Sequence, residues 1–222
     1  RAEGGESVAI GHDRRLSSPT LEAAVIEGLA QAGVRVLRAG RGPSPMCYFA
    51  NQHLGTDAAV MVTGSHNPPD YNGIKMTMLG RAFYGADIQA LGARISAGDY
   101  AEGNGEIVNA SVFDAYVDRL MQGFAGDKDL SVAWDPGNGA AGEVVTALVA
   151  RLPGRHTIIN GDIDGRFPNH HPDPTVESNL DQLKAAVVKH GCDLGLAFDG
   201  DGDRIGVVDG QGRVLWGDQI LV

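Results

Sequence analysis

The segment of this sequence with the clearest capacity for chemistry is residues 198–204, FDGDGDR, in which three aspartates alternate with two glycines. Three carboxylates this close repel one another unless a cation lies between them. The glycines let the backbone wrap so that the side chains of Asp199, Asp201 and Asp203 converge. Oxygen ligands suit a hard cation, so the segment predicts a site for Mg²⁺ or Ca²⁺.

An EF-hand loop also begins Asp-x-Asp-x-Asp, but it needs glycine at its sixth position and glutamate at its twelfth. Counted from Asp199, those positions hold Arg204 and Gly210, so this class of calcium site is excluded. Three carboxylates leave coordination positions open, and Mg²⁺ commonly completes its shell with phosphate oxygens. The segment therefore predicts a metal site beside a phosphate group. The alternative is a solvated acidic turn, which the apolar run before it disfavours.

A second segment with reactive potential places Ser65 in a turn flanked by glycine and proline, directly after the apolar run 58–63. Open α/β sheets bind ligands at the carboxyl ends of their strands, so this serine is well placed for chemistry. The hydrolase pattern Gly-x-Ser-x-Gly is not met, because Thr63 and Asn67 occupy the glycine positions, which disfavours acyl transfer. The alternative is that Ser65 and Asn67 only cap a turn.

The runs around both segments alternate between strand and helix patterns. Strands are predicted at 7–10, 34–37, 58–63, 73–78, 130–134, 156–159 and 194–198, and a hairpin at 205–216. Helices are predicted at 18–33, 46–53, 88–95, 110–123, 140–152 and 180–190, with Ser18 as the first N-cap before Pro19. The rhythm β–α–β–α–β occurs in each half, so we predict two mainly parallel three-layer α/β domains of similar topology, 1–105 and 106–222.

The bulk composition restricts the classes of function. Asp and Glu outnumber Lys and Arg by 28 to 18, for a formal charge of -10, which disfavours non-specific nucleic-acid binding. The sequence has no apolar run of about 18 residues, so no membrane span is expected. Cys47 and Cys192 lie far apart and outside any Cys-x-x-Cys pair, which favours buried free thiols and a cytoplasmic location.

Residues 63–75 (TGSHNPPDYNGIK) and 195–204 (GLAFDGDGDR) resemble the phosphoserine loop and the metal loop of the α-D-phosphohexomutases. Residues 135–139 (DPGNG) and 164–174 (DGRFPNHHPDP) resemble further stretches of that family, and the first segment is most similar to its bacterial phosphomannomutase/phosphoglucomutase branch. The resemblance covers essentially the whole chain but only the first two of the family's four domains. The chain also starts at Arg1 and lacks the family's early Tyr-Asp-Ile-Arg-Gly, so we expect an incomplete half of the enzyme.

The resemblance implies an intramolecular phosphotransferase that interconverts hexose 1-phosphate and hexose 6-phosphate, with mannose, glucose or both as the sugar. Ser65 would carry a phosphate and exchange it with the sugar through hexose 1,6-bisphosphate, which serves as intermediate and activator. One Mg²⁺ would be held by Asp199, Asp201, Asp203 and a phosphate oxygen on Ser65. The protein is expected to be a monomer or a weak dimer, with a phosphorylated hexose as its partner and neither nucleic acid nor membrane.

Further polar residues near the two segments are candidates for handling phosphate. Lys75 is predicted to polarise the transferring group or move a proton, and a solvated strand residue is the alternative. Arg204 is predicted to clamp phosphate bidentately, and His66 to hydrogen-bond it. Arg15, in a stretch similar to the family's Gly-Arg-Asp-x-Arg, and Asn67 are predicted to bind substrate phosphate. For Arg15 the alternative is a surface ion pair.

Three other functional hypotheses remain open. One is a non-catalytic module that binds Mg²⁺ and sugar phosphate, and another is a mutase for an amino-sugar phosphate. The third is a phosphatase with an aspartyl nucleophile, which predicts that Asp199→Asn eliminates activity while Ser65→Ala does not. His170 and His171 suggest a further metal site, although a proline-bounded loop that packs near the domain boundary is the preferred interpretation.

Overall fold

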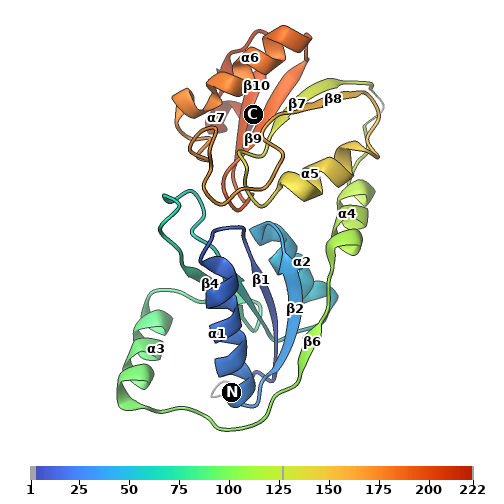
Figure 1. Ribbon diagram of the computed structural model, residues 1–222. Helices are drawn as coiled ribbons and strands as arrows, with labels where there is room; N and C mark the ends of the chain where they lie inside the picture. Colours follow the sequence, from blue (N-terminus) through green and yellow to red (C-terminus); the bar gives the residue numbers. More distant parts are fainter. Residues whose placement is uncertain (1–3, 127, 222) are drawn as a thin grey trace.

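The strands of residues 4–126 and 128–221, the part of the chain that the computed structural model describes, form one six-stranded and one five-stranded sheet. In Figure 1 the first sheet occupies the blue-to-green half of the molecule and the second the yellow-to-red half. Helices cover both sheets, so the predicted fold class of two α/β domains is confirmed. No helix in this part of the chain is long and apolar enough to span a membrane.

The first sheet has the strand order β5-β4-β3-β1-β2-β6. Its strands are β1 (Ser7–His12), β2 (Arg35–Arg41), β3 (Ala58–Val62), β4 (Ile74–Met78), β5 (Arg81–Ala82) and β6 (Ile107–Asn109). β1, β2, β3 and β6 are parallel, whereas β4 pairs antiparallel with β3 and with β5. A parallel return needs a long crossover, usually helical, and the loop between β3 and β4 contains no helix, so β4 runs back antiparallel to β3.

The helices of the first half are α1 (Ser18–Gln31), α2 (Ser44–His53), α3 (Ala86–Ala97) and α4 (Phe113–Gln122). Because successive strand residues point to opposite faces, β1 supplies both faces of the core. Val8 and Ile10 pack in one cluster with Ile26 of α1. Ala9 packs in another with Met46 of α2. α1 and α2 therefore cover opposite faces of the sheet.

The second sheet repeats this plan in the order β11-β10-β9-β7-β8. Its strands are β7 (Ser131–Asp135), β8 (Arg155–Ile158), β9 (Leu194–Phe198), β10 (Ile205–Asp209) and β11 (Val214–Leu215). Its helices are α5 (Gly142–Val149), η1 (Glu177–Leu180), α6 (Asp181–His190) and α7 (Gly217–Ile220). β7, β8 and β9 are parallel, and β10 pairs antiparallel with β9 and with β11, just as β4 does with β3 and β5. The similar topology is thus confirmed, with mixed sheets in both domains.

The segment between the two sheets differs from the expectation. β6 pairs with β2, so the first sheet extends past the predicted boundary at residue 105. α4 follows and contacts both α2 and α5. Its Val117 lies in one apolar cluster with Met46 of the first domain and Val144 of the second. The two domains therefore share a packed apolar contact beside the linker.

The prediction that Ser18 caps the first helix is wrong. Ser17 occupies the cap position without a side-chain hydrogen bond, and Ser18 is the first helical residue. The Ser18 hydroxyl instead donates to Oδ1 of Asp13, which is buried at the end of β1. A buried carboxylate needs donors more than a solvated helix end does, because its unpaired burial is costly.

Candidate active site between the two domains

The two segments with reactive potential meet where the domains face each other. Ser65 follows β3 and Asp199 follows β9, so each side chain lies at the carboxyl end of a strand. The Ser65 hydroxyl donates to Oδ2 of Asp199 over 2.9 Å. The structure therefore brings together residues that are far apart in the sequence, as expected for loops at the carboxyl edges of α/β sheets.

Ser65 is held in an unusual backbone conformation. Its φ is +51°, in the left-handed region, which costs a non-glycine residue roughly 1–2 kcal/mol. Its backbone N–H donates to Oγ1 of Thr63, which in turn donates to Oδ2 of Asp13 over 2.8 Å. Gly64 N also lies near this Asp13 oxygen. One buried carboxylate thus anchors the backbone leading to the serine.

Position 64 requires glycine because a side chain would not fit there, and not because the backbone bends at this residue. The positive φ lies at Ser65, not at Gly64. A Cβ at position 64 would lie 2.5 Å from Nε of Arg15 and 2.7 Å from the carbonyl oxygen of Tyr71. The turn therefore needs a residue without a side chain so that Arg15 can approach it.

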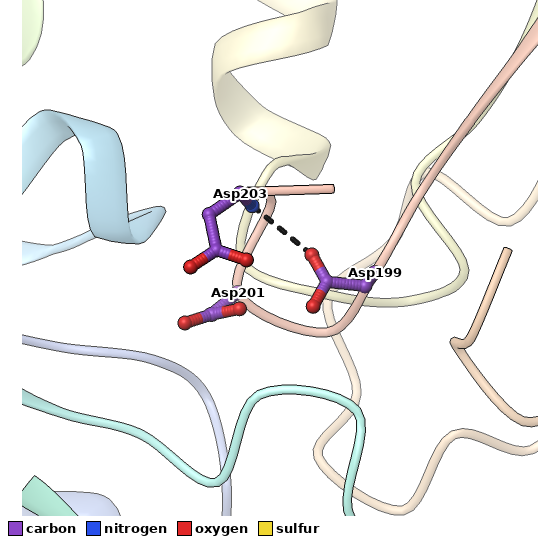
Figure 2. A group of neighbouring side chains, drawn as sticks. All are labelled: Asp199, Asp201 and Asp203. Atoms are coloured by element: carbon purple, nitrogen blue, oxygen red, sulfur yellow. Dashed lines mark hydrogen bonds between the residues drawn. The ribbon is translucent and has the colours of Figure 1, made fainter. Parts of the chain in front are cut away.

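The three aspartates form a compact cluster of carboxylate oxygens (Figure 2). One ligand atom from each of Asp199, Asp201 and Asp203 lies within 4.8 Å of the others. Asp199 and Asp201 are fully buried, whereas Asp203 is partly exposed. The backbone N–H of Asp203 donates to Oδ1 of Asp199 over 3.0 Å, the dashed line in Figure 2.

Lys75 balances part of this negative charge. Its Nζ lies 2.7 Å from Oδ2 of Asp201 and 2.7 Å from Oδ2 of Asp203. Burial opposes the charge on Lys75, but the two carboxylates outweigh it and raise the pKa of the ammonium group. Burial likewise opposes ionisation of Asp201, yet hydrogen bonds from Lys75 and Ser44 lower the pKa of that carboxyl group. Lys75 is therefore not a free strand residue but a partner of the aspartate cluster.

Asp199 is the carboxylate of the cluster whose ionisation is disfavoured by its surroundings. Burial and repulsion by Asp201 raise the pKa of Asp199 to about 7. Oδ1 of Asp201 is buried and has no hydrogen-bond partner among the described residues. A buried, unpaired carboxylate oxygen is unfavourable unless a cation binds it. The donor set therefore fits a hard cation such as Mg²⁺, which prefers oxygen ligands.

His66 and Arg204 form a pair beside Ser65. Nη1 of Arg204 lies 2.7 Å from Nδ1 of His66, and this Nδ1 is 3.5 Å from Oγ of Ser65. Because a guanidinium only donates hydrogen bonds, Nδ1 is the accepting nitrogen, which places the proton of the neutral ring on Nε2. The structure thus brings Ser65, His66 and Arg204 together, whereas Lys75 contacts the aspartate cluster through Asp201 and Asp203.

Arg15 lies differently from the phosphate ligand predicted, whereas the role of Asn67 in binding phosphate stays a prediction. The side chain of Arg15 is buried, and both of its Nη atoms donate to backbone carbonyl groups of the serine loop. One of these acceptors is the carbonyl of Asn67, which is itself exposed. The alternative of a surface ion pair is also wrong for Arg15, because its partner Asp13 is buried with it.

Two residues of the site, Ser44 and Asp13, are not among those predicted from the sequence. Ser44 donates its hydroxyl hydrogen bond to Oδ2 of Asp201, and its backbone N–H donates to the carbonyl of the same residue over 2.8 Å. Asp13 anchors the serine turn from the end of β1. Asp13 was predictable in principle, because it is a carboxylate near the carboxyl end of a predicted strand. Ser44 lies between two prolines, and nothing in that pattern indicates a role in the site.

His170 of segment 164–174 makes a structural contact, and among the described residues neither it nor His171 belongs to a cluster that could hold a metal ion. Nε2 of His170 lies 2.9 Å from Oδ2 of Asp135, and Nδ1 lies 2.9 Å from the carbonyl oxygen of His171. Both neighbouring oxygens accept, so the ring is bound as the doubly protonated imidazolium. Burial disfavours this charge, but the hydrogen bonds to Asp135 and His171 outweigh it and raise the pKa of His170.

This ion pair predicts a pH-dependent contribution to stability. Since the folded-state pKa of His170 lies above the ordinary 6.5, its contribution is fully present below that value and is lost as the pH rises through the folded pKa. We expect His170→Gln to lower the free energy of unfolding by about 1.5–3 kcal/mol near pH 6 and by less near pH 9. Urea denaturation at both pH values measures this, with the exposed His190→Gln as control. An equal loss at both pH values would contradict a charged His170.

Comparison with known proteins yields matches over the whole chain. A family model described as "Phosphoglucomutase/phosphomannomutase, alpha/beta/alpha domain I" matches residues 1–102, and the corresponding model for domain II matches residues 114–212. A phosphomannomutase/phosphoglucomutase of Pseudomonas aeruginosa is 42% identical over 221 residues, which are 100% of this chain and 48% of that protein. A phosphoglucomutase of Neisseria gonorrhoeae is 39% identical over 217 residues, 97% of this chain and 47% of that protein.

A solved structure shares the fold. The crystal structure of a phosphoglucomutase/phosphomannomutase family protein from Burkholderia thailandensis superposes with a TM-score of 0.93 at 42% sequence identity, covering 98% of this chain and 49% of that one. The chain thus spans about half the length of the curated relatives it matches.

Proposed function

The chain belongs to the phosphoglucomutase/phosphomannomutase family, and from this premise we propose that it carries the phosphate-transfer centre of a phosphohexomutase. The reaction is the interconversion of hexose 1-phosphate and hexose 6-phosphate through a phosphoserine at Ser65. The observation that carries the proposal is the hydrogen bond of 2.9 Å between the Ser65 hydroxyl and Asp199, within a cluster of three aspartates. The names of the relatives favour mannose and glucose phosphates over an amino-sugar phosphate.

In the proposed reaction Ser65 gives its phosphoryl group to a free hydroxyl of the sugar phosphate. The bond between Oγ and phosphorus breaks as the bond to the sugar oxygen forms, and the sugar hydroxyl proton balances the restored serine hydroxyl. Hexose 1,6-bisphosphate results, and return of its other phosphoryl group to Ser65 completes the cycle. Asp199 accepts the hydrogen bond of the serine hydroxyl in the unphosphorylated state.

Negative charge spreads over the oxygens of a transferring phosphoryl group, so positively charged groups around it stabilise the transition state. Lys75 and Arg204 supply positive charge from the two domains on either side of Ser65. Asp199, Asp201 and Asp203, together with a phosphate oxygen on Ser65, would hold one Mg²⁺. When bound, this ion would offset charge on the phosphoryl oxygens.

The two cysteines bear on the compartment in which the protein acts. Cys47 and Cys192 are both free and buried, which suits a reducing compartment such as the cytoplasm. We expect the protein to act there on a phosphorylated hexose as a monomer or a weak dimer.

Phosphorylation of the protein by hexose bisphosphate tests the proposal. After incubation with glucose 1,6-bisphosphate and Mg²⁺, we expect intact mass to increase by one phosphate and peptide mapping to place it on Ser65. Phosphatase treatment should reverse the increase, and removal of Mg²⁺ with EDTA should prevent it. Phosphate found only at another residue, or binding of Mg²⁺ and ligand without phosphorylation, would overturn the proposal in favour of a binding module.

A further inference from the structure

Arg15 has an unusual environment for an arginine. Its side chain is fully buried, although charged side chains are rarely buried without close partners. Its Nη1 and Nη2 atoms donate to four backbone carbonyl groups of a single loop. The acceptors are the carbonyl oxygens of Ser65 (2.6 Å), Asn67 (2.7 Å), Pro68 (2.5 Å) and Tyr71 (3.0 Å). The planar, five-donor guanidinium group can satisfy so many acceptors at once, which an ammonium group cannot.

Asp13 completes this arrangement from the other side. Its Oδ2 lies 3.3 Å from Nε of Arg15 and accepts the hydrogen bond of Thr63. The carboxylate therefore fixes the backbone before Ser65, and the guanidinium fixes the backbone from Ser65 onward. Together they enclose the residue whose φ of +51° needs support from its surroundings.

Arg15 also contacts the second domain. Its Cζ lies 5.3 Å from the ring centroid of Phe167, a distance at which a cation and an aromatic face attract each other. Beside it, a Cβ added to Gly165 would lie 2.2 Å from the carbonyl oxygen of Arg14, so the two backbones are closely packed. The same guanidinium group thus touches the serine loop and the loop that carries Phe167.

We propose that Arg15, together with Asp13, is a positioning residue that holds the Ser65 loop in its strained conformation and aligns it with the aspartate cluster. Arg15 does so through backbone carbonyls, which engage both of its Nη atoms. The inference rests on the proposed function, because the alignment it describes serves transfer at Ser65.

The test compares Arg15→Lys with Arg14→Lys, in which the exposed neighbour undergoes the same change. We expect Arg15→Lys to lower the rate constant of Ser65 phosphorylation by glucose 1,6-bisphosphate about 10- to 100-fold, since small misplacements of reacting groups have effects of this size. The KM for the bisphosphate should change little. Hydrogen exchange of amides 64–72 should become at least about tenfold faster, while β7 and β9 keep their protection. Arg14→Lys should match the wild type in all these measurements.

If Arg15→Lys does not fold, Asp13→Asn replaces it, because it removes the charge that faces Nε of Arg15 and weakens the anchor of the backbone before Ser65. A normal rate with normal protection of residues 64–72 in the folded variant would overturn the inference. So would a change confined to KM, which would make Arg15 a phosphate ligand. If the wild-type protein is not phosphorylated at all, the proposed function fails, and the hydrogen-exchange comparison alone decides whether Arg15 orders the loop.

Discussion

Under the proposed function, replacement of Ser65 with alanine is expected to lower the rate of phosphorylation of the protein by glucose 1,6-bisphosphate by at least about 10⁴-fold, as removal of a nucleophile does in other enzymes. Alanine has no oxygen that can carry the phosphoryl group, and among the described residues the other hydrogen bonds to Asp199 come from backbone N–H groups rather than from a hydroxyl. The conformation of the loop should persist, because Asp13 and Arg15 hold it through backbone groups. Loss of the hydroxyl donor to the buried Asp199 should lower the free energy of unfolding by about 1–3 kcal/mol.

Intact mass after incubation with glucose 1,6-bisphosphate measures this outcome. The control is Ser17→Ala, since Ser17 is exposed and lies in the same domain. Asp199→Asn provides the comparison with an aspartyl phosphatase, for which Ser65→Ala would remain active while Asp199→Asn would not. Ser65→Ala protein that still acquires one phosphate at wild-type speed would rule out Ser65 as the phosphate carrier.

Replacement of Gly200 with alanine is expected to slow phosphorylation of Ser65 about 10²- to 10³-fold. A Cβ at this position would lie 2.3 Å from the carbonyl oxygen of Ser65, which is a backbone atom and cannot rotate away. The metal loop and the serine loop must therefore move apart by roughly 1 Å, and a displacement of that size can cost about two orders of magnitude in rate. Gly200 has no positive φ, so steric contact between the loops is the cause.

Gly28→Ala is the matched control for this substitution. Gly28 lies within α1, and an added Cβ there has nothing within 4 Å. Alanine favours helix over glycine by roughly 0.5–1 kcal/mol, so this variant should be slightly more stable and equally active. Single-turnover kinetics measure the rate of phosphorylation of the two variants, and thermal unfolding measures their stability. A Gly200→Ala protein that is phosphorylated as fast as wild type would show that the two loops need not approach as closely as they do.

The aspartate cluster and the serine turn were predictable because their signals are local. Each follows an apolar strand directly, and the carboxyl ends of parallel strands share an edge. The repeated alternation of strand and helix patterns was sufficient to predict two α/β domains. Lys75 was within reach of the same reasoning, because it lies on the strand that returns from the serine turn.

The parts that were not predictable depend on contacts between distant segments. Arg15 follows a strand among polar residues and looks like a surface side chain, and only the folded loop makes it buried. β6 is three residues long, and its strand conformation comes from pairing with β2 rather than from its own composition. Ser18 was assigned to the helix cap because no sequence pattern shows that Asp13 needs its hydroxyl group.

β3 and β9 occupy equivalent places in their sheets, next to the antiparallel hairpin in each. Ser65 follows one of these strands and Asp199 follows the other, so under the proposed function each of two similar domains supplies one half of the transfer centre. Neither sheet by itself sets the distance between Ser65 and Asp199. That distance is set by the orientation of one domain on the other, to which the apolar contact of Met46, Val117 and Val144 contributes together with the polar contacts across the site. A substitution in this apolar contact can therefore shift Ser65 relative to Asp199 while both residues stay unchanged.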